Sequence, residues 1–549
     1  MMGRAEVDPA SGSLPGLVAD LAARYDTGLM NSQDQKTFYV TTPIYYVNDR
    51  PHIGHVYSTT LADVLARFHR LRGDDVFFLT GTDEHAAKVV DTARERGVST
   101  QDWADQNAAA FEQTFQKLGM THDDFIRTSQ DRHKDKVIEY VRQLMETGDV
   151  YEGEYEGWYD AGQEEYIPEN KAKEYDYKSP FNRKPLVRKR EKNYFFRLSA
   201  YTDRLRDWIQ ANPAFVQPEA RKNEVLARLN EGLNDVPMSR TGTGGWGIPM
   251  PGDPEQSIYV WIDALFNYLT TVDTEDRRKY WPANHHIIAK DILWFHAVIW
   301  PAVLMALDRP LPHQVYAHSF WISEGQKMSK TLGNFIDLEK IDQYVETYSL
   351  DALRYFLVTQ GPLGATDSDF AHAKFVDVYN ADLANTLGNC ASRVTNMIAR
   401  YFDGVLPEPG KVDDDGQVVI EAAAGFCERV SGLFEKFALS AAVGECFTLI
   451  SRIDNYIELT QPFKLAKDEH KRRELATILY VCAEALRIAS LPLWAVMPEK
   501  IETLWREMLS LDYDPSTGQL EAWCCWGELQ PGTTIRKAAP LFPRVQTDG

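Results

Sequence analysis

From residue 37 onward, the chain alternates between strand-like and helix-like hydrophobic patterns. Residues 38–42 are an apolar run rich in aromatic and β-branched side chains, which is typical of a buried strand. A polar turn occupies residues 48–51, and apolar side chains then recur at helical spacing at Leu61, Val64, Leu65, Phe68 and Leu71. This part of the chain is therefore predicted to form a strand, a turn and an amphipathic helix.

A second strand and two further helices follow. Residues 75–80 are predicted to be a buried strand, residues 86–96 a helix that Gly97 ends, and residues 100–118 another helix. Strands that alternate with helices form parallel sheets with helices on both faces, and ligands bind beyond the carboxyl ends of such strands. The N-terminal half is therefore predicted to be a Rossmann-like, doubly wound nucleotide-binding unit.

This α/β pattern is interrupted at residues 120–244, where short, aromatic and charged segments prevail. It resumes in four predicted elements: a strand leading into a helix at 257–268, a strand at 285–289, a helix at 292–307 that Asp291 caps, and a strand at 315–322. The later residues are helical almost throughout, at 373–402, 417–436, 439–460 and 470–494. The expected fold is thus an α/β, doubly wound domain split by an insertion and followed by an α-helical bundle.

The predicted organisation has seven parts. They are a leader without fixed structure at 1–35, the first half of the doubly wound domain at 36–119, the insertion at 120–244, the second half at 245–330, a linker with a lysine-rich loop at 331–370, the helical domain at 371–510 and an irregular tail that packs back at 511–549.

Composition narrows the functional classes. The net charge of -21 argues against a protein that coats nucleic acid non-specifically, although it permits a locally basic RNA site. No apolar run approaches the roughly 20 residues that a membrane helix needs. The first 30 residues lack the apolar core of a signal peptide and the amphipathicity of a mitochondrial presequence. The six cysteines fit no zinc-binding spacing and are expected to be free thiols, so we expect a cytoplasmic protein.

Two short motifs carry candidate chemistry. His52-Ile53-Gly54-His55 opens the first helix, where free backbone N–H groups favour a phosphate and Gly54 lets a flat ring approach. Lys327-Met328-Ser329-Lys330 lies on a polar loop in which two lysines could clamp phosphates. Each motif alone is weak, since buried structural histidines and solvated lysines are common. Together they suit attack on an α-phosphate with pyrophosphate leaving, for which His52, His55, Lys327 and Lys330 are the candidate catalytic residues.

The two motifs resemble the paired motif of class I aminoacyl-tRNA synthetases. The longer stretches PIYYVNDRPHIGH, FFLTGTDEH, YVWIDAL, AKDILWFHAVIWP and GQKMSKTLGN resemble the bacterial methionine-specific members of that class, and the similarity extends from residue 37 over nearly the whole chain. The resemblance implies a ligase of protein biosynthesis that activates L-methionine with ATP and Mg²⁺ and transfers it to initiator and elongator tRNA(Met). The C-terminal helical domain would then bind the anticodon.

The resemblance also implies roles for individual residues. Asp83 would hold the ammonium group of methionine. The pocket for the methionine side chain would be lined by Ile44, Tyr46, Trp261, Ala264, Leu265, Tyr268, Phe295 and His296. ATP would be bound by His52, Gly54, His55, Lys290, Asp291, Lys327 and Lys330, and the anticodon by Asn389, Arg393 and Phe463. An aromatic-rich pocket suits a thioether, because sulfur–aromatic contacts are favourable, although aromatic residues at these positions could equally be ordinary core.

Several residues depart from the family pattern. Where many relatives carry a zinc knuckle in the insertion, this chain has Asp160, Gln163, Ser179 and Asn182, so we predict no zinc and no other bound metal besides Mg²⁺ with ATP. Phe463 stands where a tryptophan is frequent. No appended dimerisation domain is recognised, so a monomer is expected. The basic run at residues 183–192 could contact RNA phosphates or could be a solvated loop.

Other functions remain as alternatives. The leucine, isoleucine and valine enzymes of the same class carry a large editing insertion, for which this chain has too little room between its motifs, and a cysteine-specific enzyme is expected to use a zinc–thiolate cluster. A tRNA-binding relative without activity is expected to lack His52, His55 or Lys330, which are all present. A nucleotidylyltransferase that shares the histidine motif would have no use for the long helical domain.

Overall fold

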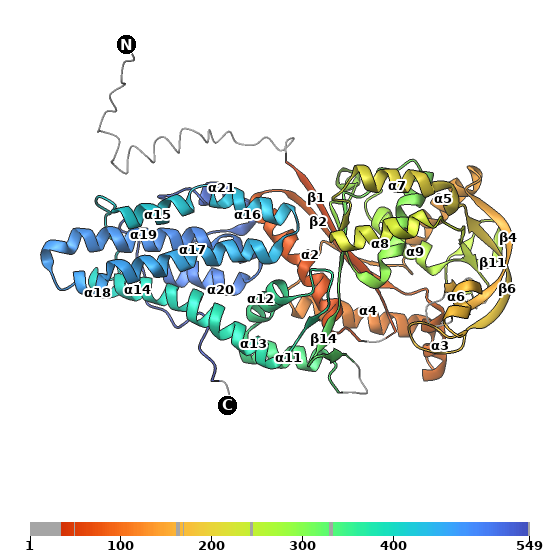
Figure 1. Ribbon diagram of the computed structural model, residues 1–549, viewed down its shortest axis with the longest axis horizontal. Coiled ribbons are helices and arrows are strands. Elements are labelled where there is room, and N and C mark those ends of the chain that lie inside the picture. Colours follow the sequence, from red (N-terminus) through yellow and green to blue (C-terminus); the bar gives the residue numbers. More distant parts are fainter. Residues whose placement is uncertain are drawn as a thin grey trace, which may run out of the picture.

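The computed structural model describes residues 35–48, 50–160, 165–167, 169–241, 245–328 and 333–546. Figure 1 shows an α/β body at one end, whose outermost part is the insertion, and a helical bundle at the other. The helix α2 (Ile53–Arg72) lies between the two and is buried along most of its length. The N-terminus of α2, which carries the histidine motif, therefore sits in the α/β body, while its far end reaches the bundle.

The centre of the α/β body is a parallel, six-stranded sheet. Its order is β3 (Asp124–Arg127), β2 (Asp75–Asp83), β1 (Thr37–Tyr46), β12 (His285–Ala289), β13 (Gln314–His318) and β7 (Val216–Gln217). The strand order reverses between β1 and β12, which is the switch point where doubly wound sheets bind ligands. Both edge strands, β3 and β7, come from the range 120–244 that was expected to form the insertion.

Helices cover both faces of this sheet. They are α2, α3 (Ala87–Arg96), α4 (Thr100–Lys117), α5 (Asp131–Glu146), α9 (Val260–Thr270) and α10 (Trp300–Ala306). One hydrophobic core joins α2 to the helical bundle, and a second core joins the other sheet face to α5, α9 and α10. The predicted strands and helices of residues 37–118 are present, although β1 is longer than expected because its pairing with β2 continues past a register shift between Thr41 and Ile44.

Two predicted elements of the second half differ in form. The helix expected at residues 292–307 begins as a 3₁₀ turn at Lys290–Ile292, widens to a π-helix at Phe295–Ile299 and becomes the α-helix α10 only at Trp300. Pro301 has no N–H to donate to the preceding turn, so a regular α-helix cannot form there. The N-cap position of this turn is Ala289, which has no side chain that can accept an N–H. The prediction that Asp291 is the cap is therefore wrong.

The strand expected at residues 315–322 is two strands in different sheets. After β13, the Ser319 N–H donates to the Pro362 carbonyl, and the chain then enters β14 (Trp321–Ser323). β14 pairs with β15 (Gln326–Lys327) and with β16 (Ser368–Asp369). This small sheet lies beside α11 (Leu338–Tyr348) and α12 (Leu350–Gln360), and it carries the start of the lysine-rich loop.

The insertion is built on an antiparallel sheet of β5 (Glu165–Ile167), β4 (Val150–Asp160), β6 (Val187–Phe196) and β8 (Val236–Pro237). Next to it are α6 (Glu169–Glu174), α7 (Thr202–Ala211), α8 (Glu219–Asn230) and a second sheet of β9 (Ser239–Arg240), β10 (Pro249–Met250) and β11 (Asp253–Ile258). Much of the basic run at residues 183–192 lies in β6, so it is mostly a strand and not a loop, while Arg188 and Lys192 are exposed to solvent. Arg190 pairs with Glu154 on β4 at 2.8 Å.

The bundle contains α13 (His372–Val378), a π-helical segment at Tyr379–Gly388, α14 (Asn389–Tyr401), α15 (Asp414–Ala423), α16 (Phe426–Glu435), α17 (Leu439–Thr460), α18 (Pro462–Leu465), α19 (Arg472–Ser490), α20 (Pro498–Thr503) and α21 (Leu520–Trp523). The helix expected at 417–436 is broken in two at Gly425, whose φ of 64° only glycine adopts readily. All six cysteines are free thiols, as predicted.

One helical segment of the bundle, Glu469–Ala495, is long and apolar enough to cross a membrane. The expectation that no run reaches this hydropathy is therefore wrong. The whole apolar window is buried inside the protein, which is what the central helix of a bundle requires. Its only buried ion pair joins Arg487 to Glu484, and Glu484 also accepts the Gly527, Glu528 and Leu529 N–H groups, which fixes the C-terminal residues to the bundle.

Candidate active site

The histidine motif forms a reciprocal cap at the start of α2. The His52 Nδ1 accepts the Gly54 N–H at 3.1 Å, and the His55 Nδ1 accepts the His52 N–H at 3.2 Å. The two rings are 3.8 Å apart between centroids. A side chain at Gly54 would place its Cβ 3.0 Å from the His52 Cε1, so any larger residue would make the His52 ring shift.

This cap determines the protonation of both rings. Because each Nδ1 accepts a backbone N–H, each proton resides on Nε2, and both rings are neutral. Burial and the neighbouring His52 keep the pKa of His55 well below its usual value, which agrees with a neutral ring. Two Nε2–H donors are thus placed at a helix N-terminus, where the helix dipole already favours an anion.

The segment after the lysine-rich loop is joined to this cap. The Ile53 N–H donates to the Ile336 carbonyl at 3.1 Å, and His52 and Asp337 form an isolated antiparallel bridge. Lys327 is exposed on β15, and its carbonyl accepts the Asn334 amide at 3.3 Å. Lys330 lies outside the described residues, so only the base of the loop can be placed near the histidines.

Lys290 and Asp291 follow the carboxyl end of β12 in the 3₁₀ turn. The Lys290 Nζ lies 2.5 Å from the Asp367 carboxylate and 4.8 Å from the centroid of the Phe320 ring. The same carboxylate accepts the Phe320 N–H at 2.8 Å, and the Lys290 ammonium holds the pKa of Asp367 below its usual value. Asp291 is exposed beside this pair.

Most residues predicted to line a methionine pocket are on α9 and on the irregular helix after β12. The Trp261 and Phe295 rings stack at 3.9 Å with an angle of 10° between them, and Tyr46 meets Trp261 edge-on at 6.1 Å. Ala264 and Leu265 are buried on α9, and Ile44 is half-buried near the end of β1. The contacts bring three aromatic rings together beside the switch point of the sheet.

Tyr268 and His296 form the polar base of this group. The Tyr268 hydroxyl lies 2.7 Å from the His296 Nε2, and the His296 Nδ1 lies 3.0 Å from the Ile292 carbonyl. Since a carbonyl only accepts, Nδ1 carries the proton and Nε2 accepts from Tyr268. Burial lowers the pKa of His296 to about 4, so the ring presents no charge at neutral pH.

Asp83 is buried at the carboxyl end of β2, opposite Tyr46 in the strand register. Beneath it lies a network that the sequence analysis missed. The buried Asp263 carboxylate is 2.6 Å from the His85 Nδ1 and 2.7 Å from the His133 Nε2. The network ties the residues after β2 to α9 and so sets the spacing between Asp83 and the aromatic group. One indication of this network was present in the sequence: Asp263 is a charged residue among the predicted pocket residues of α9.

The three predicted anticodon residues lie in the bundle, away from the histidine cap (Figure 1). Asn389 begins α14 and is exposed, and Arg393, one turn later, pairs with Asp454 at 3.0 Å and Glu458 at 2.6 Å. Phe463 on α18 is 46% exposed although it is a large apolar ring.

The insertion offers no thiolate set for zinc. The Ser179 hydroxyl accepts the Phe181 and Asn182 N–H groups at 3.3 Å each, and the Asn182 side chain accepts the Lys184 N–H. Asp160 is buried, and Gln163 lies outside the described residues. A small apolar core of Ile167, Ala172 and Leu186 fills the space beside this turn. In the described part of the chain no cluster of three or more metal-ligating side chains exists, and hydroxyl and amide groups engaged in this way do not fit zinc.

Comparisons with known proteins agree on one family. The protein-family model described as tRNA synthetases class I (M) matches residues 38–180 and 176–395 of this chain. The methionine–tRNA ligase of Caldanaerobacter subterraneus subsp. tengcongensis is 43% identical, with 94% of this chain and 80% of the relative covered. That of Listeria monocytogenes is 42% identical, over 94% of this chain and 79% of the relative.

Solved structures give the same result. The Mycobacterium tuberculosis methionyl-tRNA synthetase in complex with methionyl-adenylate superposes with a TM-score of 0.86 at 38% identity, covering 93% of this chain and all of that one. Its free form superposes with a TM-score of 0.81 at 35% identity, over 94% of this chain and all of that one. The chain belongs to the methionyl-tRNA synthetase family of class I aminoacyl-tRNA synthetases.

Proposed function

We propose that the protein is a methionine–tRNA ligase, which joins L-methionine to ATP and then transfers it to tRNA(Met), both initiator and elongator, as a monomer in the cytoplasm. In the first step a methionine carboxylate oxygen attacks the α-phosphorus of ATP. The bond from the α-phosphorus to the bridging oxygen breaks, and pyrophosphate leaves with Mg²⁺. In the second step a ribose hydroxyl at the 3′ end of the tRNA attacks the methionyl carbonyl, and AMP leaves.

One observation carries this proposal: the reciprocal cap of His52 and His55. The first step needs no protein nucleophile, so catalysis depends on placing donors where negative charge develops on phosphate oxygens. The cap engages both Nδ1 atoms, so in each ring the proton is on Nε2, at a helix N-terminus. We assign the Nε2–H groups to the α-phosphate and Lys290, Lys327 and Lys330 to the leaving pyrophosphate, with Asp291 contacting the nucleotide.

The aromatic group beside the cap supports methionine as the substrate. A thioether is polarisable and weakly polar, and Trp261, Phe295 and Tyr46 offer ring faces and edges that suit sulfur. The neutral His296 and its partner Tyr268 can hydrogen-bond without placing a charge against the sulfur. The buried Asp83 carboxylate supplies the opposite charge that the methionine ammonium requires.

Amino-acid-dependent exchange between ATP and pyrophosphate tests the first step. We expect exchange with methionine and none of comparable rate with the other nineteen amino acids, in the absence of tRNA. Exchange with another amino acid would overturn the pocket assignment but leave the class I mechanism. A folded sample that binds tRNA and shows no exchange would contradict the proposed activity.

Arg393 tests the second step and its dependence on the anticodon. Arg393 pairs with Asp454 and Glu458 at the surface of the bundle, so replacing it should not disturb the core. We expect Arg393→Ala to reduce kcat/KM for tRNA charging by about tenfold or more, since a lost charged contact is worth about 1.5–3 kcal/mol. The methionine-dependent exchange should stay unchanged, and a parallel loss of exchange would contradict the separation of the two sites.

A further inference from the structure

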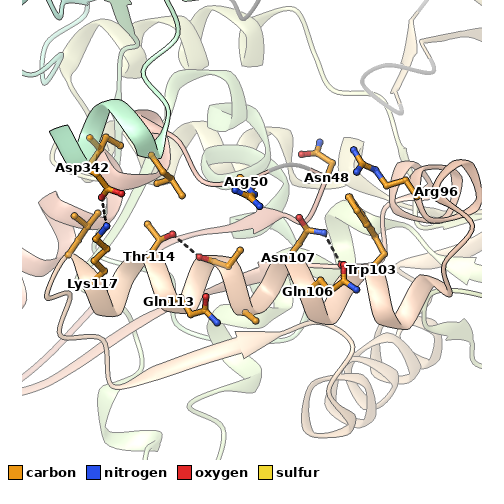
Figure 2. Close-up of a pocket in the computed structure, with 15 residues that line it drawn as sticks. Asn48, Arg50, Arg96, Trp103, Gln106, Asn107, Gln113, Thr114, Lys117 and Asp342 are labelled. Atoms are coloured by element: carbon orange, nitrogen blue, oxygen red, sulfur yellow. Dashed lines mark hydrogen bonds and ion pairs between the residues drawn. The ribbon is translucent and has the colours of Figure 1, made fainter. Parts of the chain in front are cut away.

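A polar cavity of about 640 Å³ lies next to the histidine cap, on the side of α4 and α11. We call it the α4 cleft. Figure 2 shows Asn48, Arg50 and Arg96 on one side and the side chains of α4 on the other, with Asp342 of α11 at one end. Arg50 precedes His52 by only two positions, so the cleft lies close to the candidate active site.

The α4 cleft is basic in an acidic protein. The whole chain has 80 acidic and 59 basic residues, yet among the described residues the cleft is lined by three cations and a single carboxylate. The cations are Arg50, Arg96 and Lys117, and the carboxylate, Asp342, is paired with Lys117 at 2.6 Å. The balance of charge at this place favours a polyanion.

The floor of the cleft is one face of α4 that carries amides and no carboxylate. The residues that line it recur at helical spacing: Trp103, Gln106, Asn107, Ala110, Gln113, Thr114 and Lys117. The acidic residues of the helix, Asp102, Asp105 and Glu112, are not among them. Amide side chains pair with ribose hydroxyls and base edges, while arginines bind phosphates and stack on bases. The Arg96 guanidinium already lies over the Trp103 ring at 4.6 Å.

The position of the cleft agrees with an extended ligand. In Figure 1, α14, α13, α11 and α4 follow one another along the lower edge of the molecule, from the predicted anticodon helix to the α/β body. A tRNA bound by α14 and reaching the histidine cap along this edge would pass the α4 cleft.

We propose that the α4 cleft binds a short stretch of the tRNA backbone near the acceptor end, with phosphates on Arg50 and Arg96 and riboses or base edges on the amides of α4. The inference rests on the proposed function for the identity of the RNA. The cleft then orients the tRNA for transfer and takes no part in adenylate formation.

An isosteric change of charge tests the proposal. Gln113 is exposed in the cleft, and Gln113→Glu adds a carboxylate without changing size. Gln116 is exposed on the same helix outside the cleft, so Gln116→Glu is the matched control. We expect Gln113→Glu to raise KM for tRNA and the Kd of a tRNA transcript about fivefold at low salt, and less at high salt, where phosphate contacts are screened. Gln116→Glu should change neither by more than about twofold.

Asp342→Asn makes the opposite change of charge, because it removes the carboxylate that the described residues place in the cleft, and it should lower both KM for tRNA and the Kd of the transcript. A general loss of stability cannot produce opposite effects in the two variants. The methionine-dependent exchange should be the same in all of them. Equal tRNA constants for Gln113→Glu and Gln116→Glu would overturn the proposal. A raised KM for ATP with unchanged tRNA constants would show a free-nucleotide site instead. Absence of exchange in the unmodified protein would refute the proposed activity, and the transcript-binding comparison would still decide on the cleft.

Discussion

At the scale of single residues, the two nitrogens of each motif histidine have separate tasks. Nδ1 of His52 and of His55 completes the cap of α2, and Nε2–H is the donor that we assign to the α-phosphate. A capped helix N-terminus keeps few unpaired N–H groups, and the imidazoles extend its positive potential outward. Gly54 is fixed by the same contact, because a Cβ there would press against the His52 ring.

Lys290 is held by Asp367, and we expect this pair to compete with the nucleotide. The Nζ lies 2.5 Å from the carboxylate, and both side chains are partly exposed, so phosphates can displace the carboxylate. Asp367→Asn should lower KM for ATP in the exchange reaction about two- to fivefold, the range of a surface ion pair. KM for methionine should not change.

The control for this prediction is Asp377→Asn, an exposed carboxylate on α13. An unchanged or increased KM for ATP in Asp367→Asn would show that the carboxylate helps to position Lys290 and does not compete with ATP.

The motif residues could be placed from sequence because each acts where its own strand or helix ends. Asp83 ends β2, and His52 and His55 lie at the start of α2, which follows β1, as the α/β alternation predicts. Lys290 follows β12 in the same way. The network of Asp263, His85 and His133 could not be predicted from the sequence. Its hydrogen bonds join residues 178 and 130 positions apart and depend on how α9 packs. The pairing of Lys290 with Asp367, 77 residues apart, was hidden for the same reason.

At the scale of elements, hydrophobic period predicted the type of the helices and strands at residues 37–118, of those of the second α/β half and of the bundle, but not their regularity. It predicted no elements for residues 120–244 or 331–370, where the structure has several. Pro301 forces a π-helical turn, Gly425 divides one long amphipathic pattern into two helices, and the chain changes sheets at Ser319. Each irregularity comes from a local backbone feature, which the spacing of apolar residues does not reveal.

The turn at Ser179 is held by hydrogen bonds, so we expect removal of zinc to affect neither the stability nor the activity of the protein. Ser179 holds its turn by accepting two backbone N–H groups, and the core of Ile167, Ala172 and Leu186 supplies the packing. Treatment with a zinc chelator, followed by return of Mg²⁺, should leave the melting temperature and the exchange rate within error of the untreated sample. Loss of either, restored by zinc, would show a metal site.

At the scale of the whole molecule, a buried ion pair joins α2 to the bundle. Asp63 on α2 lies 2.7 Å from Arg354 on α12, and Arg354 donates to the Ala495 and Val496 carbonyls. Arg354 thus fixes α2 relative to the C-terminal helices, and both charged groups are buried. Sequence periodicity predicted the α/β body and the bundle separately, but it could not predict this connection, since its partners lie 291 residues apart.

Buried neutral histidines predict a loss of stability in mild acid. Burial lowers the pKa of His285 to about 3 and that of His296 and His318 to about 4. Below the unfolded value near 6.5, the unfolded chain binds protons that the folded protein does not, so stability is full above about pH 6.5 and falls toward pH 4. On going from pH 6.5 to pH 5, each of these histidines should lower the free energy of unfolding by about 1.5 kcal/mol.

Asp351 has the opposite effect, because burial raises its pKa to about 6. Over the same pH interval it should increase the free energy of unfolding by about 1 kcal/mol. For these four groups the expectation is a net loss of stability, measured as a lower urea midpoint at pH 5 than at pH 6.5. Equal midpoints at the two pH values would contradict the neutral, buried state of these histidines.

The central claim is that the cap holds His52 so that its Nε2–H stabilises the transition state, and one pair of variants separates the two roles. In His52→Asn the side-chain oxygen can still accept the Gly54 N–H, because asparagine is a strong N-cap, but the outer donor is gone. We would measure methionine-dependent ATP–pyrophosphate exchange and urea stability in this variant, with His52→Ala, which loses the cap as well, as the comparison. We predict that kcat falls about 100-fold in His52→Asn with KM for methionine and stability unchanged. Exchange within about threefold of the unmodified protein, in a stable His52→Asn variant, would contradict the claim.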